Sequence, residues 1–328
     1  MSRRICRVLV LAAALCALPG CVDARSDRAR ILDLLGQAAD LDAVHVKVGQ
    51  RIRAVNALVA MGPKVVAVLV ERLDTRDVHE FLEISNVLAR IGRPATPALA
   101  GALDRGNART RRAAARVLRE YRDRASHGPL ARAIDDPDPR VREDAALALA
   151  AQRAPQALPL LAGIVSPGRA AREDPDVVKA ACCGVSQLIG DSRSGRPPEK
   201  LAGHLAALLV SGHLGVRHSA AVAVERIGPA ALKELEPVID RFLIPGVFVA
   251  VGCYGRILGA HPALRAGPAG ARFVALLSHP DPVVRARAFE GLATWGLEGK
   301  RLGLARLSAE PSPLVRQAIM SLASRRGR

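Results

Sequence analysis

The chain repeats one helix-like pattern nine times, and this period limits the fold more than any other feature. Each copy starts at a register residue, which is usually basic. Small or apolar residues follow three, four, seven and ten positions later. The register residues are Arg51, Phe81, Arg111, Arg142, Lys179, Arg217, Phe248, Arg285 and Arg316. Their spacings of 30 to 38 residues are typical of a solenoid of stacked helical units.

Each repeat is predicted to hold two helices. Asp138-Pro139, Asp281-Pro282 and Ser312-Pro313 place a capping side chain before a proline at the first helical position. A glycine eleven positions after the register residue is predicted to end the first helix in the left-handed conformation; the third and fourth repeats lack one. The closing glycines are Gly62, Gly92, Gly190, Gly228, Gly259, Gly296 and Gly327. Second helices are predicted at 65–73, 97–103, 158–164, 201–209, 238–243 and 272–277, from apolar residues at helical spacing.

The N-terminus has the features of an export signal. A basic start precedes an apolar run over 8–18, which is shorter than the roughly 20 residues that span a bilayer as a helix. The run ends in Leu18-Pro19-Gly20-Cys21, which resembles the lipobox of bacterial lipoproteins. The resemblance implies cleavage before Cys21 and lipid on its sulfur; the alternative is an ordinary secretory signal with an incidental cysteine. We therefore divide the chain into a signal peptide (1–20), a lipidated tether with a capping helix over about 27–39 (21–45), and the solenoid (46–328).

Net charge and amino-acid composition restrict which kinds of molecule the chain can bind. Loss of residues 1–20 removes three arginines and no acid, which lowers the net charge from +17 to +14. Such basicity is compatible with nucleic acid, anionic lipid or an acidic protein. Export argues against nucleic acid, and five Phe, two Tyr and one Trp offer few platforms for base stacking.

Three cysteines remain after the signal and the lipid site. Cys182 and Cys183 occupy the plus-three and plus-four slots, where other repeats have Ala145-Ala146 or Ala220-Ala221. Buried cysteine behaves as a small apolar residue, so both are predicted in the core with Ala145, Ala146 and Leu149. Cys253 lies two repeats further on, beyond disulfide reach. A redox or metal role is the alternative to structural thiols.

Two segments make the repeat family recognisable. Asp-Pro-Asp-Pro-Arg-Val-Arg-Glu-Asp-Ala-Ala (136–146) and His-Pro-Asp-Pro-Val-Val-Arg-Ala-Arg-Ala (279–288) resemble HEAT repeats of the type found in phycobilisome lyases. The resemblance covers roughly residues 46–328. It implies an all-α, right-handed α-solenoid of about nine helix pairs, with the first helices on the concave face. It also implies a structural role between repeats for Arg142, Arg217, Arg285 and Arg316.

No catalytic or metal constellation emerges from the sequence. His79-Glu80 is a single pair and lacks the second histidine of a zinc-protease helix. His213 and His218 are five residues apart and do not share a helical face. We expect no cofactor and no enzymatic activity. Insertions at 166–174, 191–199 and 260–269 are expected to form loops, which can carry contacts.

A stripe of four arginines is the candidate binding surface. Arg109, Arg112, Arg116 and Arg119 follow three- and four-residue spacing and therefore share one helical face. The resemblance places that face on the concave side. Acidic peptide, anionic lipid or cell-wall carboxylates would suit the stripe, whereas a solvated charged face is the simpler interpretation.

These features together predict a membrane-anchored scaffold that binds another protein on its concave face. The alternative is an accessory subunit or enzyme of the bilin-lyase type, which would need histidine, glutamate or cysteine clustered on that face. Val22 follows the lipidated cysteine in place of aspartate, which favours the outer membrane, facing the periplasm. The identity of the partner and the oligomeric state stay open.

Overall fold

The computed structural model describes residues 19–40, 48–153, 156–190, 197–241 and 245–324. Within these ranges the chain consists of helices, turns and loops, with no strand. All nine register residues lie in helices, so the predicted all-α solenoid of repeated helix pairs is confirmed. The fold divides into two compact units, Met1–Val141 and Arg142–Arg328, and the division falls inside α9 (Pro139–Gln152).

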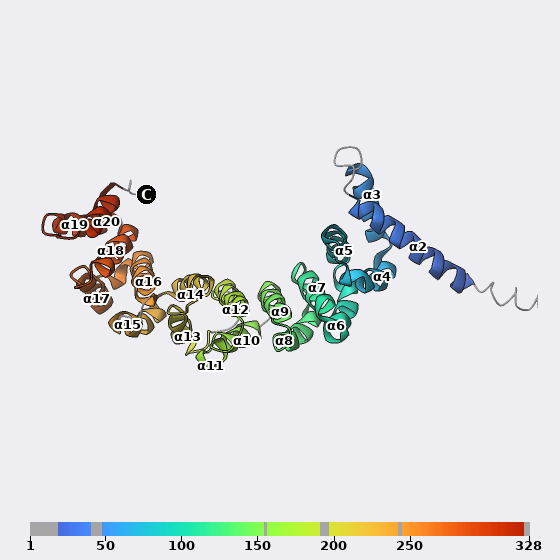
Figure 1. Cartoon of the computed structure of the whole chain (residues 1–328), viewed down its shortest axis with the longest axis horizontal. Coiled ribbons are helices and arrows are strands. Elements are labelled where there is room, and N and C mark those ends of the chain that lie inside the picture. The colour runs from blue at the N-terminus through green and yellow to red at the C-terminus, as the bar shows by residue number, and fades with distance from the viewer. Residues whose placement is uncertain (1–18, 41–47, 154–155, 191–196, 242–244, 325–328) are drawn as a thin grey trace, which may run out of the picture. The chain divides into compact units, whose positions relative to one another are not determined.

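Unit 1 contains two rows of helices behind an N-terminal helix. The helices are α2 (Pro19–Ala39), α3 (Val48–Ala60), α4 (Val66–Glu71), α5 (Val78–Ile91), α6 (Thr96–Arg105), α7 (Ala108–Arg119) and α8 (His127–Ala133). The first helices α3, α5 and α7 pack side by side, and the second helices α4, α6 and α8 form the other row (Figure 1). Helix α2 packs against α3 and α5 and covers the start of the stack.

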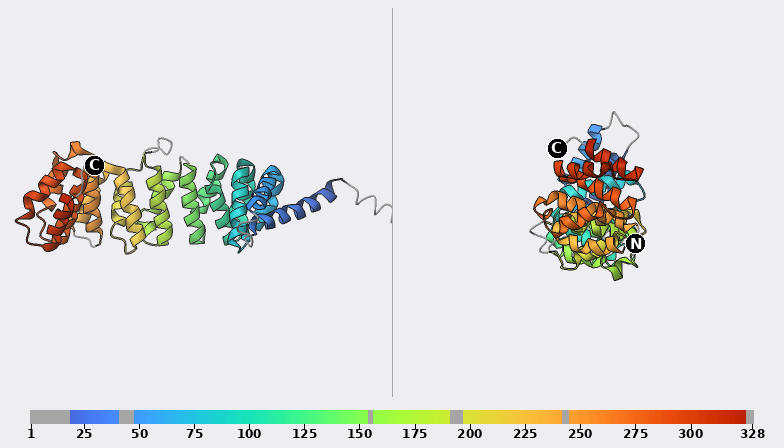
Figure 2. Two further views of the ribbon diagram at one scale, coloured as in Figure 1. Left: turned by 90° about the horizontal axis from the view of Figure 1, so that it is seen from above. Right: turned by 90° about the vertical axis from the view of Figure 1, so that its left-hand side faces the viewer.

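Unit 2 continues the same arrangement of paired helices. Its elements are α10 (Ala157–Ile164), α11 (Pro167–Ala170), α12 (Pro175–Leu188), α13 (Leu201–Leu208), α14 (Leu214–Ile227), α15 (Leu232–Asp240), α16 (Gly246–Ala260), α17 (Pro268–Leu276), α18 (Pro282–Gly291), α19 (Leu297–Leu307) and α20 (Pro313–Ser324). Helices α12, α14, α16, α18 and α20 form one row, and α13, α15, α17 and α19 pair with them from the other side (Figure 1). In the view turned by 90°, the helices of unit 2 stand side by side (Figure 2). Five successive first helices therefore present one continuous face.

Local capping signals fix where the first helices begin. Helices α9, α18 and α20 start at Pro139, Pro282 and Pro313, as the Asp-Pro and Ser-Pro pairs predict. Asp281 accepts hydrogen bonds from the N–H groups of Val283 and Val284, which would otherwise lack helical partners.

The closing glycines fall into two kinds. Five of them have a positive φ between 60° and 84°; these are Gly62, Gly92, Gly190, Gly228 and Gly296. For Gly259 the prediction was wrong, because this residue lies inside α16. A Cβ at Gly259 would lie 2.0 Å from Thr294 Oγ1, so the glycine permits close packing between neighbouring repeats. Arg153, eleven residues after Arg142, adopts φ +50° where other repeats have glycine. Gly327 lies outside the described residues.

The small-residue slots form the core that the register predicts, with one exception. Ala145, Ala146, Leu149 and Cys182 are buried. Cys183 is only half-buried, unlike Ala146 in the same slot of the preceding repeat, and its thiol lies 3.4 Å from Ser219 Oγ of α14. The prediction that Cys183 is a core residue was therefore wrong.

Several second helices differ from their predicted bounds. Helix α15 begins at Leu232, six residues before the predicted start, and tolerates Pro237 in its interior. Helices α8 and α19 were not predicted. Helix α2 extends back to Pro19 through the expected tether, since proline is compatible with a first helical turn. Among the described residues no single helix has the length and apolarity for a membrane crossing, although one bent pair, Gly49–Ala60 with Gly62–Asp74, passes on length and composition alone.

Candidate partner-binding site

Buried ion pairs connect register arginines to the following repeat. Arg142 Nη2 lies 2.6 Å from Glu173 Oε1, and Arg285 Nη2 lies 2.7 Å from Glu310 Oε1. Both carboxylates are buried, and in each case the acid stands six residues before the next register residue. Arg111 forms the same kind of pair with Asp136, at 2.7 Å. The repeat period therefore brings an arginine of one repeat next to an acid of the following repeat.

The register arginines also bond to their own loops. Arg217 donates to the Ser211 carbonyl oxygen at 2.7 Å, Arg285 to that of His279 at 2.8 Å, and Arg316 to that of Glu310 at 3.1 Å. Each acceptor lies six residues before its donor. The structure thus places all four predicted structural arginines in polar contacts at or between repeats. In the sequence, the partner acid is marked by its position six residues before the next register residue.

The ion pairs set the protonation of their acids. Hydrogen bonds from Arg285 lower the pKa of Glu310 below its usual value, although burial opposes this. Burial raises the pKa of Glu173, but hydrogen bonds from Arg142 and from the Asp174 N–H outweigh burial and leave that pKa lowered. Both acids therefore stay ionised at neutral pH and hold their arginines.

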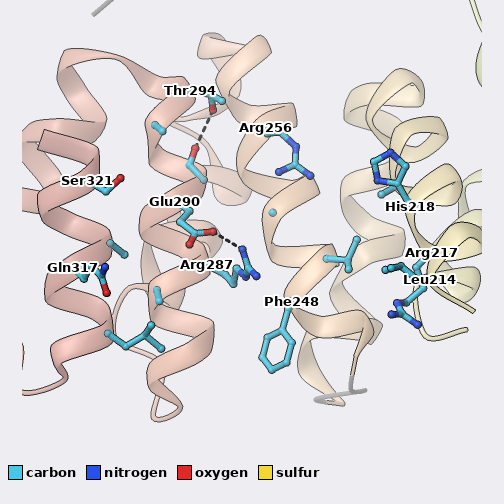
Figure 3. Close-up of a pocket in the computed structure, with 18 residues that line it drawn as sticks. Leu214, Arg217, His218, Phe248, Arg256, Arg287, Glu290, Thr294, Gln317 and Ser321 are labelled. Atoms are coloured by element: carbon cyan, nitrogen blue, oxygen red, sulfur yellow. Dashed lines mark hydrogen bonds and ion pairs between the residues drawn. The ribbon is translucent and has the colours of Figure 1, made fainter. Parts of the chain in front are cut away.

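A groove of about 730 Å³ crosses the face of unit 2 formed by first helices. Side chains of α14, α16, α18 and α20 line it, together with the 3-10 turn Leu292–Trp295 (Figure 3). The lining residues with large or polar side chains are Leu214, Arg217, His218, Phe248, Arg256, Arg287, Glu290, Thr294, Leu314, Gln317 and Ser321. The groove is large enough for a stretch of polypeptide, since ligand pockets are commonly about 300–1,000 Å³.

This groove combines apolar and polar side chains. Leu214 and Phe248 lie toward the N-terminal ends of their helices, and Leu214 is 70% exposed (Figure 3). Arg287 and Glu290 form an ion pair of 2.6 Å in the middle, and Arg256 pairs with Glu225 at 2.6 Å. The groove therefore offers a hydrophobic contact beside hydrogen-bonding groups, a combination typical of protein recognition.

The arginine stripe lies partly in a second, smaller pocket, on unit 1. Arg109, Arg112 and Arg116 line a cavity of about 210 Å³, whereas Arg119 does not. The Arg116 guanidinium lies 5.1 Å from the centroid of the Phe81 ring, and Arg119 contacts Glu120 at 3.6 Å. The four arginines share a helix, but only three of them share a site.

One feature of the sequence marks both sites. Phe81 and Phe248 are the two register positions with an aromatic residue in place of a basic one. Phe81 lines the small pocket and Phe248 lines the groove. An aromatic ring at this register cannot form the inter-repeat ion pair, and it leaves an apolar surface on the first-helix face.

Reactive chemistry is not apparent in the described parts of the chain. They contain no group of three or more His, Cys, Asp or Glu residues placed to hold a metal ion. Burial raises the pKa of Cys182 and Cys253 to about 12, so both thiols are protonated at neutral pH. Cys21 lies in α2, but its side chain is outside the described part of the structure.

Comparison with known proteins agrees with this architecture. Residues 96–182 match a family model described as HEAT repeats. No curated protein matches the chain. The chain is an all-α solenoid of HEAT-like helix pairs.

Solved structures are similar to this chain at low sequence identity and with TM-scores below 0.5. An engineered protein is 17% identical, with 90% of this chain and 87% of that one covered and a TM-score of 0.43. The complex of CpcE and CpcF of phycocyanin lyase from Nostoc sp. is 19% identical, with 80% of this chain and 93% of that one covered and a TM-score of 0.39. Kap121p is 15% identical, with 92% of this chain and 36% of that one covered and a TM-score of 0.48.

Proposed function

We propose that this protein is a membrane-anchored scaffold that binds a segment of a partner protein in the groove of unit 2. The observation that carries the proposal is the groove itself, which four successive first helices line with exposed apolar and polar side chains. Solenoids offer extended surfaces of this kind to other proteins. Large apolar side chains at a solvent-facing groove are stabilised when a partner covers them.

The anchor is the second part of the proposal. The Leu-Pro-Gly-Cys sequence supports lipid attachment at Cys21, and lipidated envelope proteins carry more than one acyl chain, which gives stable anchoring. We propose the outer membrane, with the solenoid facing the periplasm. No observation favours the alternative of a bilin-lyase-type subunit: of the described groove residues, His218 and Glu290 alone have the side chains that such chemistry would use.

Site-specific photocrosslinking tests the groove directly. A photoreactive residue at Leu214 is expected to give one discrete adduct in cells, because Leu214 lies at the apolar margin of the groove. The matched control is Leu297 of α19, which is 81% exposed but does not line the groove. An adduct pattern that is identical at Leu214 and Leu297 would contradict the proposal.

A further inference from the structure

The small pocket on unit 1 is lined both by exposed aliphatic side chains and by arginines. Val78 and Leu82 of α5 are 65% and 49% exposed, and both line the pocket. Arg76, Arg109 and Arg112 line the same cavity from the preceding loop and from α7. Helices α5 and α7 are neighbours in the first-helix row (Figure 1). Exposed aliphatic side chains and several guanidinium groups therefore line the same pocket.

The charges in this pocket are strongly unbalanced. Four arginines and one acid, Asp77, line it. The Asp77 carboxylate already caps α5, because it accepts hydrogen bonds from the N–H groups of His79 and Glu80. The carboxylate of Asp74, outside the lining, lies 4.0 Å from Arg109 and is itself half exposed. A pair of exposed charges at this separation contributes little, so Arg76 and Arg109 keep this part of the pocket positive.

The geometry points to a partner of defined chemistry. We infer that this pocket binds an acidic peptide segment of a partner protein, with one large apolar side chain between carboxylates. The apolar side chain would cover Val78 and Leu82, and the carboxylates would face the arginines, which can bind them in a bidentate manner. This site is separate from the groove of unit 2, and the proposed function does not depend on it.

The size and shape of the pocket favour a peptide over a membrane surface. A cavity of 210 Å³ holds roughly seven water molecules at about 30 Å³ each, which is comparable to one or two side chains. A flat lipid surface cannot enter such a recess, whereas a single projecting side chain can. Nucleic acid is a poor fit because the one aromatic ring, Phe81, is already covered by Arg116.

Fluorescence anisotropy with a short labelled peptide, a leucine flanked by glutamates, tests the inference on the purified chain. Replacing Arg76 and Arg109 by glutamine is expected to weaken binding at least about tenfold. The single variant Leu82→Ser is expected to weaken binding as well. Binding of the peptide to the unmodified protein is expected to fall as salt is added. Peptides with glutamine for glutamate, or serine for leucine, are expected to bind poorly.

Matched variants separate a defined pocket from general positive charge. Arg119→Gln with Arg122→Gln removes two charges from the same region without touching the pocket lining, and Ile52→Ser removes an exposed apolar side chain of α3. Both controls are expected to bind the peptide normally. Equal loss in the Arg119/Arg122 variant, or no loss in Leu82→Ser, would overturn the inference. So would the loss of binding to phosphatidylglycerol vesicles in the Arg76/Arg109 variant while the peptide still binds.

Discussion

Arg285 reaches forward to Glu310 and back to the carbonyl oxygen of its own loop. Its side chain thus closes the gap between α18 and the loop before α20 with charged hydrogen bonds. A hydrogen bond that involves a charged group contributes about 1.5–3 kcal/mol, and loss of one partner leaves the other buried without its complement. Residues of this kind make adjacent repeats depend on each other.

Replacing Glu310 by glutamine is expected to destabilise the protein by about 1–3 kcal/mol at neutral pH. Because the pKa of Glu310 is lowered in the folded state, its stabilising contribution is complete above the unfolded pKa of about 4.3 and is lost as pH falls through the folded pKa. The difference between the two proteins in thermal melting should therefore shrink below about pH 4.

Glu298→Gln provides the control for this prediction. Glu298 also pairs with an arginine, Arg265, at 3.0 Å, but its side chain is 53% exposed. Exposed pairs contribute about 0–1 kcal/mol, so this variant should melt close to the parent. A Glu310 variant as stable as the Glu298 variant would mean that the inter-repeat pair does not hold the stack.

At the scale of the helices, close approach between repeats is decided by a few glycines. A Cβ at Gly255 would meet Phe273 Cζ at 2.7 Å and Gly291 Cα at 2.8 Å. The carbonyl oxygen of Gly255 also accepts the Trp295 Nε1–H hydrogen bond at 3.1 Å. Helix α16 can therefore pack this closely against α18 and the Leu292–Trp295 turn only because Gly255 and Gly259 face them.

Gly259→Ala is expected to destabilise the protein by about 1–3 kcal/mol, because the new methyl group overlaps Thr294. Gly163→Ala is the matched control: Gly163 lies in α10 and has nothing within 4 Å of an added Cβ. That change should stabilise by about 0.5–1 kcal/mol, since alanine favours helix over glycine. Chemical denaturation measures both, and the same sign for the two changes would contradict the packing described.

The same residues show what the sequence could and could not predict. Helix starts such as Pro282 were predictable because the capping residue and the proline are adjacent in the chain. The role of Gly259 was not, since it depends on Thr294 in the next repeat. The arginine stripe followed from helical spacing alone. Its division into three pocket residues and Arg119 depends on α5, whose position relative to α7 no local pattern specifies.

At the scale of the whole molecule, each compact unit carries one candidate site. The pocket belongs entirely to unit 1, and the groove belongs entirely to unit 2. The proposed lipid anchor at Cys21 belongs to the N-terminal end of unit 1. Anchoring and partner binding are thus assigned to different stretches of the chain and can be tested independently.

Cys21→Ser is expected to leave an unprocessed or soluble protein, because the sulfur that would carry the lipid is missing. Fractionation of membranes, with metabolic labelling by a fatty acid, measures the change. Cys183→Ser is the control, since this half-buried thiol lies far along the chain from the signal. A Cys21 variant that is processed and bound to membranes like the parent would refute the anchor and leave the groove proposal intact.

The spacing of the buried ion pairs bears on how such a chain can gain or lose repeats. Asp136, Glu173 and Glu310 each stand six residues before the register residue of their own repeat, and each contacts the register arginine of the repeat before it. The fourth repeat thus brings an acid, Asp136, for its predecessor and an arginine, Arg142, that pairs with its successor. Duplication or deletion of this repeat would join one register arginine to another equivalent acid, so the length of the protein can change there in evolution without stranding a buried charge.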